Sequence, residues 1–246
     1  MKVCFLGTNG WYDTKLGNTL CVLVESSKAY IIFDAGNGLY KLNKYIKDKR
    51  PIYLFLSHFH LDHIIGLHTL NKFNFPQGIN VFGPKGIKEM FKLIINTPYS
   101  MPVSKLKTRV RIKEIDKNLK LPFEISFKEL FHSTKCYGYR LTVDGKTIAF
   151  CTDTGPCKNI VELSKGVDLL IAESSLSSGK VDTGWPHLNP QQAAKIARDG
   201  KVKKLVLVHF DPKNYLQTID IKFAEKASRK IFKNSIAAKE DYEYCF

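Results

Sequence analysis

Short apolar runs alternate with longer amphipathic runs along the whole chain. Runs of about four to eight residues rich in β-branched and aromatic side chains predict buried strands, here at 2–6, 20–25, 29–34, 52–56, 79–82, 109–114, 124–131, 138–143, 146–151, 167–171 and 204–208. The segments between them carry apolar residues at helical spacing, which predicts helices at about 38–48, 64–71, 84–95, 157–164, 190–199 and 222–232. Because no change of composition divides these elements, we expect residues 1–246 to form one domain of mixed α and β structure.

Turn and cap residues refine this pattern. Two pairs of strands, 20–25 with 29–34 and 138–143 with 146–151, read as hairpins, and Asp144-Gly145 is a favoured two-residue turn for the second pair. A helix should begin with Asn189 as N-cap and Pro190 at its first position, and end at Gly200. The hairpins argue against a simple series of parallel βαβ units. The basic stretch 96–108, with two prolines, should be a surface loop.

Composition narrows the class of protein. The chain has 246 residues, of which 44% are hydrophobic and 25% charged, and these values exclude a disordered chain. No apolar run reaches the ~18–20 residues that span a bilayer, and the N-terminus does not resemble a signal peptide, so we expect a cytoplasmic protein with no membrane partner. The cysteines form no C-x-x-C pair, and four of them (Cys4, Cys21, Cys136 and Cys151) should be small buried hydrophobes.

The net charge of +15 has two interpretations. A basic chain attracts phosphates and nucleic acid. Lysine also occurs along the whole chain, however, as a general compositional bias would produce. The sequence alone leaves both interpretations open.

Four metal-ligand side chains fall within six positions after the apolar run that ends at Ser57. They are His58, His60, Asp62 and His63. Composition alone would produce this H-x-H-x-D-H spacing in roughly 3 of 10,000 such chains, so chance is a poor explanation. Imidazole and carboxylate groups suit zinc, and also iron or manganese. The segment therefore predicts a metal site at the end of a strand.

Three further ligand candidates also follow apolar runs. His132, Asp153 and His209 each stand where a core strand should end. A lone histidine in such a place is usually structural. A set of them beside a four-ligand motif instead favours a shared metal site. His68, five residues after His63 on a helical pattern, is expected not to be a ligand.

The order of these motifs resembles that of the metallo-β-lactamase superfamily. The resemblance implies an αβ/βα four-layer sandwich, with two packed sheets covered by helices. It also implies two divalent metal ions, with zinc expected and manganese or iron open. It assigns His58, His60 and His132 to one metal, Asp62, His63 and His209 to the other, and Asp153 to both.

Within this superfamily the chain is most similar to ribonuclease Z and related phosphodiesterases. Ala172-Glu173-Ser174 and His187-Leu188-Asn189-Pro190 carry this similarity, and it implies that Glu173 and His187 form a proton-donating pair. It also implies a homodimer. The long glycine- and proline-rich arm of tRNA-binding members is absent between His132 and Asp153, where one hairpin fills the interval.

These observations predict a dinuclear zinc phosphodiesterase whose substrate is RNA at its 3′ end or a small, cyclic nucleotide-like phosphodiester. Water activated between the metals would attack, Asp62 would hold its proton, and Glu173 with His187 would protonate the leaving group. Asp34, Ser57 and Thr154 should orient the ligands. The alternatives are a carbon-centre hydrolase of the same fold, of the lactonase, thioesterase or β-lactamase type, and a nucleic-acid-binding protein with a vestigial site.

Overall fold

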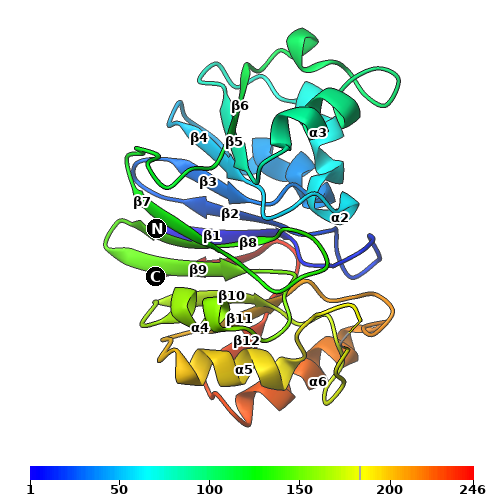
Figure 1. The fold of residues 1–246 in the computed structure, drawn as a ribbon, viewed down its shortest axis with the longest axis vertical. Coiled ribbons are helices and arrows are strands. Elements are labelled where there is room, and N and C mark those ends of the chain that lie inside the picture. Colours follow the sequence, from blue (N-terminus) through cyan, green and yellow to red (C-terminus); the bar gives the residue numbers. More distant parts are fainter. Residues whose placement is uncertain (183) are drawn as a thin grey trace.

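Two β-sheets packed face to face form the centre of the computed structural model, which describes residues 1–182 and 184–246. Helices cover the outer face of each sheet, so that the layers run helix, sheet, sheet, helix (Figure 1). This four-layer αβ/βα arrangement confirms the expected fold class.

The first sheet is built from the N-terminal half of the chain and one C-terminal strand. Its seven strands lie in the order β13-β1-β2-β3-β4-β5-β6. Strands β3 to β6 are parallel, whereas β13, β1, β2 and β3 pair antiparallel. The bounds are β1 Lys2–Gly7, β2 Cys21–Glu25, β3 Tyr30–Phe33, β4 Ile52–Phe55, β5 Ile79–Gly83, β6 Val110–Glu114 and β13 Tyr242–Cys245.

The second sheet is built from the C-terminal half. Its six strands lie in the order β12-β11-β10-β9-β8-β7. Strands β9 to β12 are parallel, and β8 pairs antiparallel with both β7 and β9. The bounds are β7 Glu124–Glu129, β8 Tyr137–Val143, β9 Lys146–Cys151, β10 Leu169–Glu173, β11 Leu205–Val208 and β12 Ser235–Ala237.

The helices are short and fall into two sets. On the first sheet lie α1 Leu42–Tyr45, α2 Leu61–Ile64 and α3 Ile87–Ile94, with the 3-10 helices η1 Asn37–Lys41, η2 Ile65–Lys72 and η3 Val103–Lys105. On the second sheet lie α4 Lys158–Ser164, α5 Pro190–Asp199 and α6 Thr218–Arg229. None of the helices in the described residues has both the length and the apolar character to traverse a bilayer.

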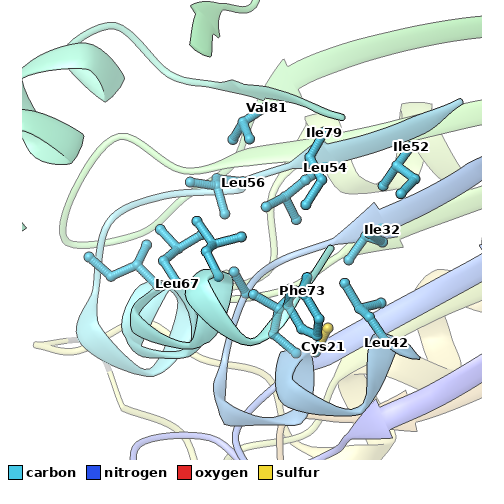
Figure 2. Packing of buried hydrophobic residues seen from close by; sticks show 14 of the residues in the cluster. Cys21, Ile32, Leu42, Ile52, Leu54, Leu56, Leu67, Phe73, Ile79 and Val81 are labelled. Atoms are coloured by element: carbon cyan, nitrogen blue, oxygen red, sulfur yellow. The ribbon is translucent and has the colours of Figure 1, made fainter. Parts of the chain in front are cut away.

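Three apolar layers hold these elements together. Many aromatic side chains fill the space between the sheets, where the Phe33 ring stacks on Phe150 at a centroid distance of 4.9 Å. A second layer lies between the first sheet and its helices, where Leu54, Leu67 and Phe73 meet (Figure 2). A third lies under α4, α5 and α6. Burial of this apolar surface is the main force that fixes the sheets relative to each other.

Most expected elements are present with small shifts of boundary. All eleven predicted strands exist as β1 to β11, both hairpins form, and Asn189 caps α5 through a hydrogen bond from the Gln192 amide. The four cysteines expected in the core are buried. Each half does contain a run of parallel strands beside its hairpins.

The predictions differ from the structure in the helices and at the chain's end. The segments expected as helices 38–48 and 64–71 are helical over 37–45 and 61–72, and both are largely 3-10, because α1 and α2 have only four residues each. The sequence analysis missed β12 and β13. β12 has only three residues, and β13 is a largely exposed strand at the edge of its sheet, so neither has the apolar alternation by which strands are found.

The strand directions place the carboxyl ends of several strands from both sheets at the same side of the molecule. Strands β3 and β4 run parallel in the first sheet. Strands β7, β9, β10 and β11 all run one way in the second, because β7 and β9 are each antiparallel to β8. The segments that follow these strands carry every candidate ligand of the sequence analysis. Open α/β sheets commonly hold their sites at such carboxyl ends.

Candidate metal centre

The segment after β4 supplies four of the candidate side chains. The buried His58 and the half-buried His60 lie between β4 and α2, with His60 in extended conformation, and Asp62 and His63 follow on α2. The α2 segment is fixed against the turn after β3, because the Ala35 amide donates to the His63 carbonyl at 2.8 Å and the Gly66 amide to the Ala35 carbonyl at 2.8 Å. These two hydrogen bonds hold the Asp62 and His63 side chains at the edge of the sheet.

The second sheet supplies the other three. His132 follows β7, Asp153 follows β9 and His209 follows β11. Asp153 and His209 have φ values of 52° and 55°. This left-handed conformation is costly for residues other than glycine, and such residues cluster at functional sites. The sharp turn aims both side chains back across the edge of the sheet instead of along the strand.

The structure brings all seven side chains together in two groups that share one residue. His58, His60, His132 and Asp153 form the first group, and Asp62, His63, Asp153 and His209 the second. Within each group the potential ligand atoms all lie within 4.8 Å of one another. Both groups combine side chains from the two sheets.

Ring nitrogens face each other across both groups. His63 Nε2 lies 3.1 Å from His209 Nε2, and His132 Nε2 lies 3.2 Å from His60 Nδ1. The buried His58 Nε2 and His132 Nδ1 have no hydrogen-bond partner among the described residues. Buried polar nitrogens without partners are costly, and a cation bound between converging imidazoles and carboxylates would satisfy those that face it. The side chains present therefore fit divalent metal ions.

A network behind the ligands sets which ring nitrogen faces the centre. Ser57 donates its hydroxyl to Asp34 Oδ2 at 2.8 Å and so accepts from His58 Nδ1, 2.9 Å away. The same Asp34 oxygen lies 2.8 Å from His63 Nδ1. With protons held on the outer Nδ1 atoms, both Nε2 lone pairs point inward. Asp34 and Ser57 thus lie where the sequence analysis expected orienting residues.

Thr154 has a different role from the one expected. Its amide donates to Glu173 Oε1 at 2.5 Å, and its hydroxyl donates to the Gly155 carbonyl. Neither group contacts a ligand side chain, because the turn after Asp153 carries Thr154 away toward β10. Thr154 therefore positions Glu173. His68, as expected, lies outside both groups and is exposed on η2.

Glu173 and His187 form a pair beside the second group. The fully buried Glu173 carboxylate lies 2.8 Å from His187 Nδ1. Burial opposes the charge on His187, but Glu173 outweighs burial and raises the pKa of the imidazole to about 9. The His187 ring lies 5.8 Å from the His209 ring and 5.4 Å from the His132 ring. The Glu173–His187 pair therefore stands next to both groups.

The pKa shifts differ between the two groups. Burial lowers the pKa of His58 well below its usual value, which keeps the lone pair on one ring nitrogen free. In the second group burial opposes the charge on His63, but the carboxylates of Asp153 and Asp62 outweigh burial and raise the pKa of His63. Burial likewise opposes ionisation of Asp153, and the neighbouring His209 and His63 lower its pKa well below the ordinary range.

Four contributors were missed by the sequence analysis. Ser175 Oγ lies 2.8 Å from His209 Nδ1 and holds that ring as Ser57 holds His58. The Trp11 amide donates to Asp62 Oδ2 at 2.8 Å, and a Cβ at Gly10 would lie 2.5 Å from the His209 ring. The Trp185 ring stacks on His60 at 5.5 Å. Of these four residues, the sequence could have suggested only Ser175, because it lies two residues after Glu173.

Comparisons with known proteins agree with this fold and site. The model of the beta-lactamase superfamily domain matches residues 29–210. The ribonuclease Z of Bacillus licheniformis is 26% identical and that of Thermoplasma volcanium 25%, and each alignment covers 99% of this chain and at least 97% of the relative. The chain therefore belongs to the metallo-β-lactamase superfamily, and it is a hydrolase of the branch that contains ribonuclease Z.

Solved structures show the same architecture. The metallo-β-lactamase fold protein YhfI of Bacillus subtilis has a TM-score of 0.83 at 23% identity, over 99% of this chain and 98% of YhfI. The short form of human tRNase Z has a TM-score of 0.75 at 22% identity, over 100% of this chain and 99% of that structure. At these identities the similarity shows a common fold.

Proposed function

We propose that this protein is a phosphodiesterase that binds two divalent metal ions, and that these ions are zinc. His58, His60 and His132 would hold one ion, Asp62, His63 and His209 the other, and Asp153 both. The similarity to ribonuclease Z proteins over nearly the full chain supports the reaction class, and the two convergent ligand groups support the metal number. When bound, the ions would supply an activated water and neutralise charge on the phosphate.

The observation that carries the proposal is the Glu173–His187 pair at 2.8 Å. Hydrolysis of a phosphodiester breaks a phosphorus–oxygen bond and leaves an alkoxide that needs a proton. His187 would donate that proton, and Glu173 keeps its imidazole charged and oriented. Hydrolysis of a thioester leaves a thiolate, which makes a weaker demand on a leaving-group acid.

Asp62 would accept the proton that the attacking water loses. The Trp11 amide fixes its Oδ2 atom at 2.8 Å, and the carboxylate lies at the edge of the second group, 3.2 Å from His209 Nε2. As the new phosphorus–oxygen bond forms, the water proton would pass to Asp62, while the His187 proton would pass to the leaving oxygen. Exchange with solvent would then restore both residues.

Both RNA 3′ ends and small cyclic phosphodiesters fit this chemistry. The residues between His132 and Asp153 form only the β8–β9 hairpin, so the tRNA-binding arm is absent at that place. The homodimer implied by the resemblance and the cytoplasmic location stay predictions. Analytical ultracentrifugation would test the first.

The experiment that tests the proposal compares two chromogenic substrates together with metal analysis. The purified protein is expected to hydrolyse bis(p-nitrophenyl) phosphate, to leave the β-lactam nitrocefin intact, and to carry about two metal ions per chain. His68→Ala is the matched control, because this exposed histidine on η2 belongs to neither group. Turnover of the lactam without turnover of the phosphodiester would contradict the proposal and favour the carbon-centre hydrolase.

A further inference from the structure

Nearly half of the net positive charge lies in one segment, residues 85–120, which we name the basic lobe. It holds ten basic and three acidic residues, a net charge of +7 in a chain of net charge +15. The lobe consists of α3, η3 and β6 with their connecting loops. In Figure 1 it forms the end of the molecule farthest from α5 and α6. Charge is therefore concentrated here, which an even compositional bias does not explain.

All ten basic side chains of the lobe are exposed, and within the described part of the chain none of them forms an ion pair. They are Lys85, Lys88, Lys92, Lys105, Lys107, Arg109, Arg111, Lys113, Lys117 and Lys120. Two of the three acids are engaged with backbone amides, since Glu114 accepts from Gly86 and Asp116 from Asn118. The lobe thus presents positive charge that its own residues do not neutralise.

A cavity in the lobe combines this charge with apolar surface. It has a volume of about 280 Å³ and lies between α3 and the loop around η3. The exposed Lys88 and Lys92 line it, one helical turn apart on α3, together with the buried Phe91 and Ile95. Cations beside an apolar surface suit a nucleic acid strand, whose phosphates and bases make these two kinds of contact.

The lobe begins beside the metal centre. Gly86, at the start of α3, adopts a φ of 95°, and a Cβ placed there would lie 3.8 Å from the ring of Phe59. Phe59 stands between the candidate ligands His58 and His60. A polymer with one phosphate in the centre could therefore continue directly onto the lobe.

We infer that the basic lobe binds the phosphate backbone of single-stranded RNA that extends from the metal centre. This inference rests on the proposed phosphodiesterase function and narrows its substrate to a polynucleotide. A cyclic mononucleotide has a single phosphate, which the centre itself would occupy, and it would leave the ten cations of the lobe without a role. Lys88 and Lys92, which line the cavity, contact this backbone in the proposed complex.

The test measures binding of a fluorescein-labelled, phosphorothioate-linked 20-nucleotide RNA to the metal-loaded protein by anisotropy at several salt concentrations. Each lost phosphate contact to a single strand removes ~0.7 from the slope of log affinity against log salt. The double variant K88Q/K92Q should therefore lower the slope by about 1.4 and weaken binding at 0.1 M salt about 20-fold. The matched control K222Q/K226Q removes two exposed lysines at the same spacing on α6, and its slope should stay unchanged.

Turnover of bis(p-nitrophenyl) phosphate separates failure of this inference from failure of the proposed function. K88Q/K92Q should hydrolyse this small substrate like the wild type while its KM for RNA rises. Equal RNA binding by both double variants, with the small diester still hydrolysed, would overturn the inference alone. Absence of diester turnover in the wild type would overturn both. Lysine-dependent binding to phosphatidylserine vesicles without RNA binding would show that the lobe serves a membrane surface, and would also overturn the inference.

Discussion

The direction of each ring nitrogen decides what this site can bind. In His58, His63 and His209 the Nδ1 atom is held from behind by a hydroxyl or a carboxylate at 2.8–2.9 Å. The Nε2 atoms are therefore the ones that meet at the centre. Orientation of this kind lowers the cost of ordering the ligands when a metal binds.

Asp153 belongs to both groups, so its loss should affect both metals. Asp153→Ala is expected to reduce the metal content from about two ions per chain to near zero, whereas His132→Ala should remove about one, because it belongs only to the first group. Plasma mass spectrometry after gel filtration measures this. A full metal complement in Asp153→Ala would show that the carboxylate is not shared.

His187 should affect turnover without affecting metal content. His187→Ala is expected to slow hydrolysis of RNA by ~10²–10⁴-fold, the usual loss for a general acid. Its effect on bis(p-nitrophenyl) phosphate should be much smaller, because nitrophenolate leaves without a proton. Rates on both substrates are compared at equal metal content. Equal losses on the two substrates would assign His187 a role other than proton donor.

The sequence reveals the candidate metal ligands more readily than the residues that contact and orient these ligands. His58, His60, Asp62 and His63 are dense enough along the chain to stand out from chance. Contacts such as Ser175 with His209, 34 positions apart, join residues whose proximity only the paired strands β10 and β11 create. The stacking of Trp185 on His60 likewise depends on the path of a loop, which no local sequence pattern predicts.

Among the elements, the contact of α2 and η2 with the turn after β3 sets the position of two ligands. A Cβ on Gly66 would lie 2.1 Å from the Gly36 carbonyl oxygen and 2.8 Å from that of Ala35. These distances leave no room for a side chain, so α2 can approach the sheet only with glycine at this position.

Gly66→Ala is therefore expected to push α2 away from β3. Overpacking of this kind costs ~1–3 kcal/mol of stability, and it should also reduce metal content in the second group, which holds Asp62 and His63. Thermal unfolding and metal analysis measure the two effects. Gly184→Ala is the control, because among the described residues a Cβ there meets only an Asp182 oxygen at 3.6 Å. Unchanged metal content in Gly66→Ala would show that α2 can move without disturbing its ligands.

Strands are better predicted than helices in this fold for a physical reason. The core strands are buried on both faces and read as continuous apolar runs, as Leu205–Val208 does. The helical segments 37–45 and 61–72 are short and partly 3-10, so tertiary contacts set their ends and their length. The exposed edge strand β13 depends on its pairing with β1.

For the molecule as a whole, each ligand group joins the two sheets. His58 and His60 extend from the first sheet, and His132 and Asp153 from the second. A metal that binds only the folded chain stabilises it by ~2.7 kcal/mol when its free concentration is a hundred times its Kd. The metals should therefore strengthen the contact between the sheets.

Removal of metal should accordingly lower the stability of the protein. Dialysis against a chelator is expected to reduce the unfolding temperature, and zinc should restore it. Asp153→Ala, which lacks the shared ligand, should show little response to either treatment. Calorimetry measures these shifts. An unfolding temperature that does not depend on metal in the wild type would show that apolar packing alone fixes the sheets.

The two halves of this chain would meet at shared metal ions. The lifetime of the protein should therefore depend on the supply of those ions. Without ions, the strand ends around His58 and Asp153 would keep their charges but lose the bonds between them. That edge would then open more often, and proteases cut open segments first. In a zinc-starved cell, the amount of this protein should therefore fall after its activity is lost.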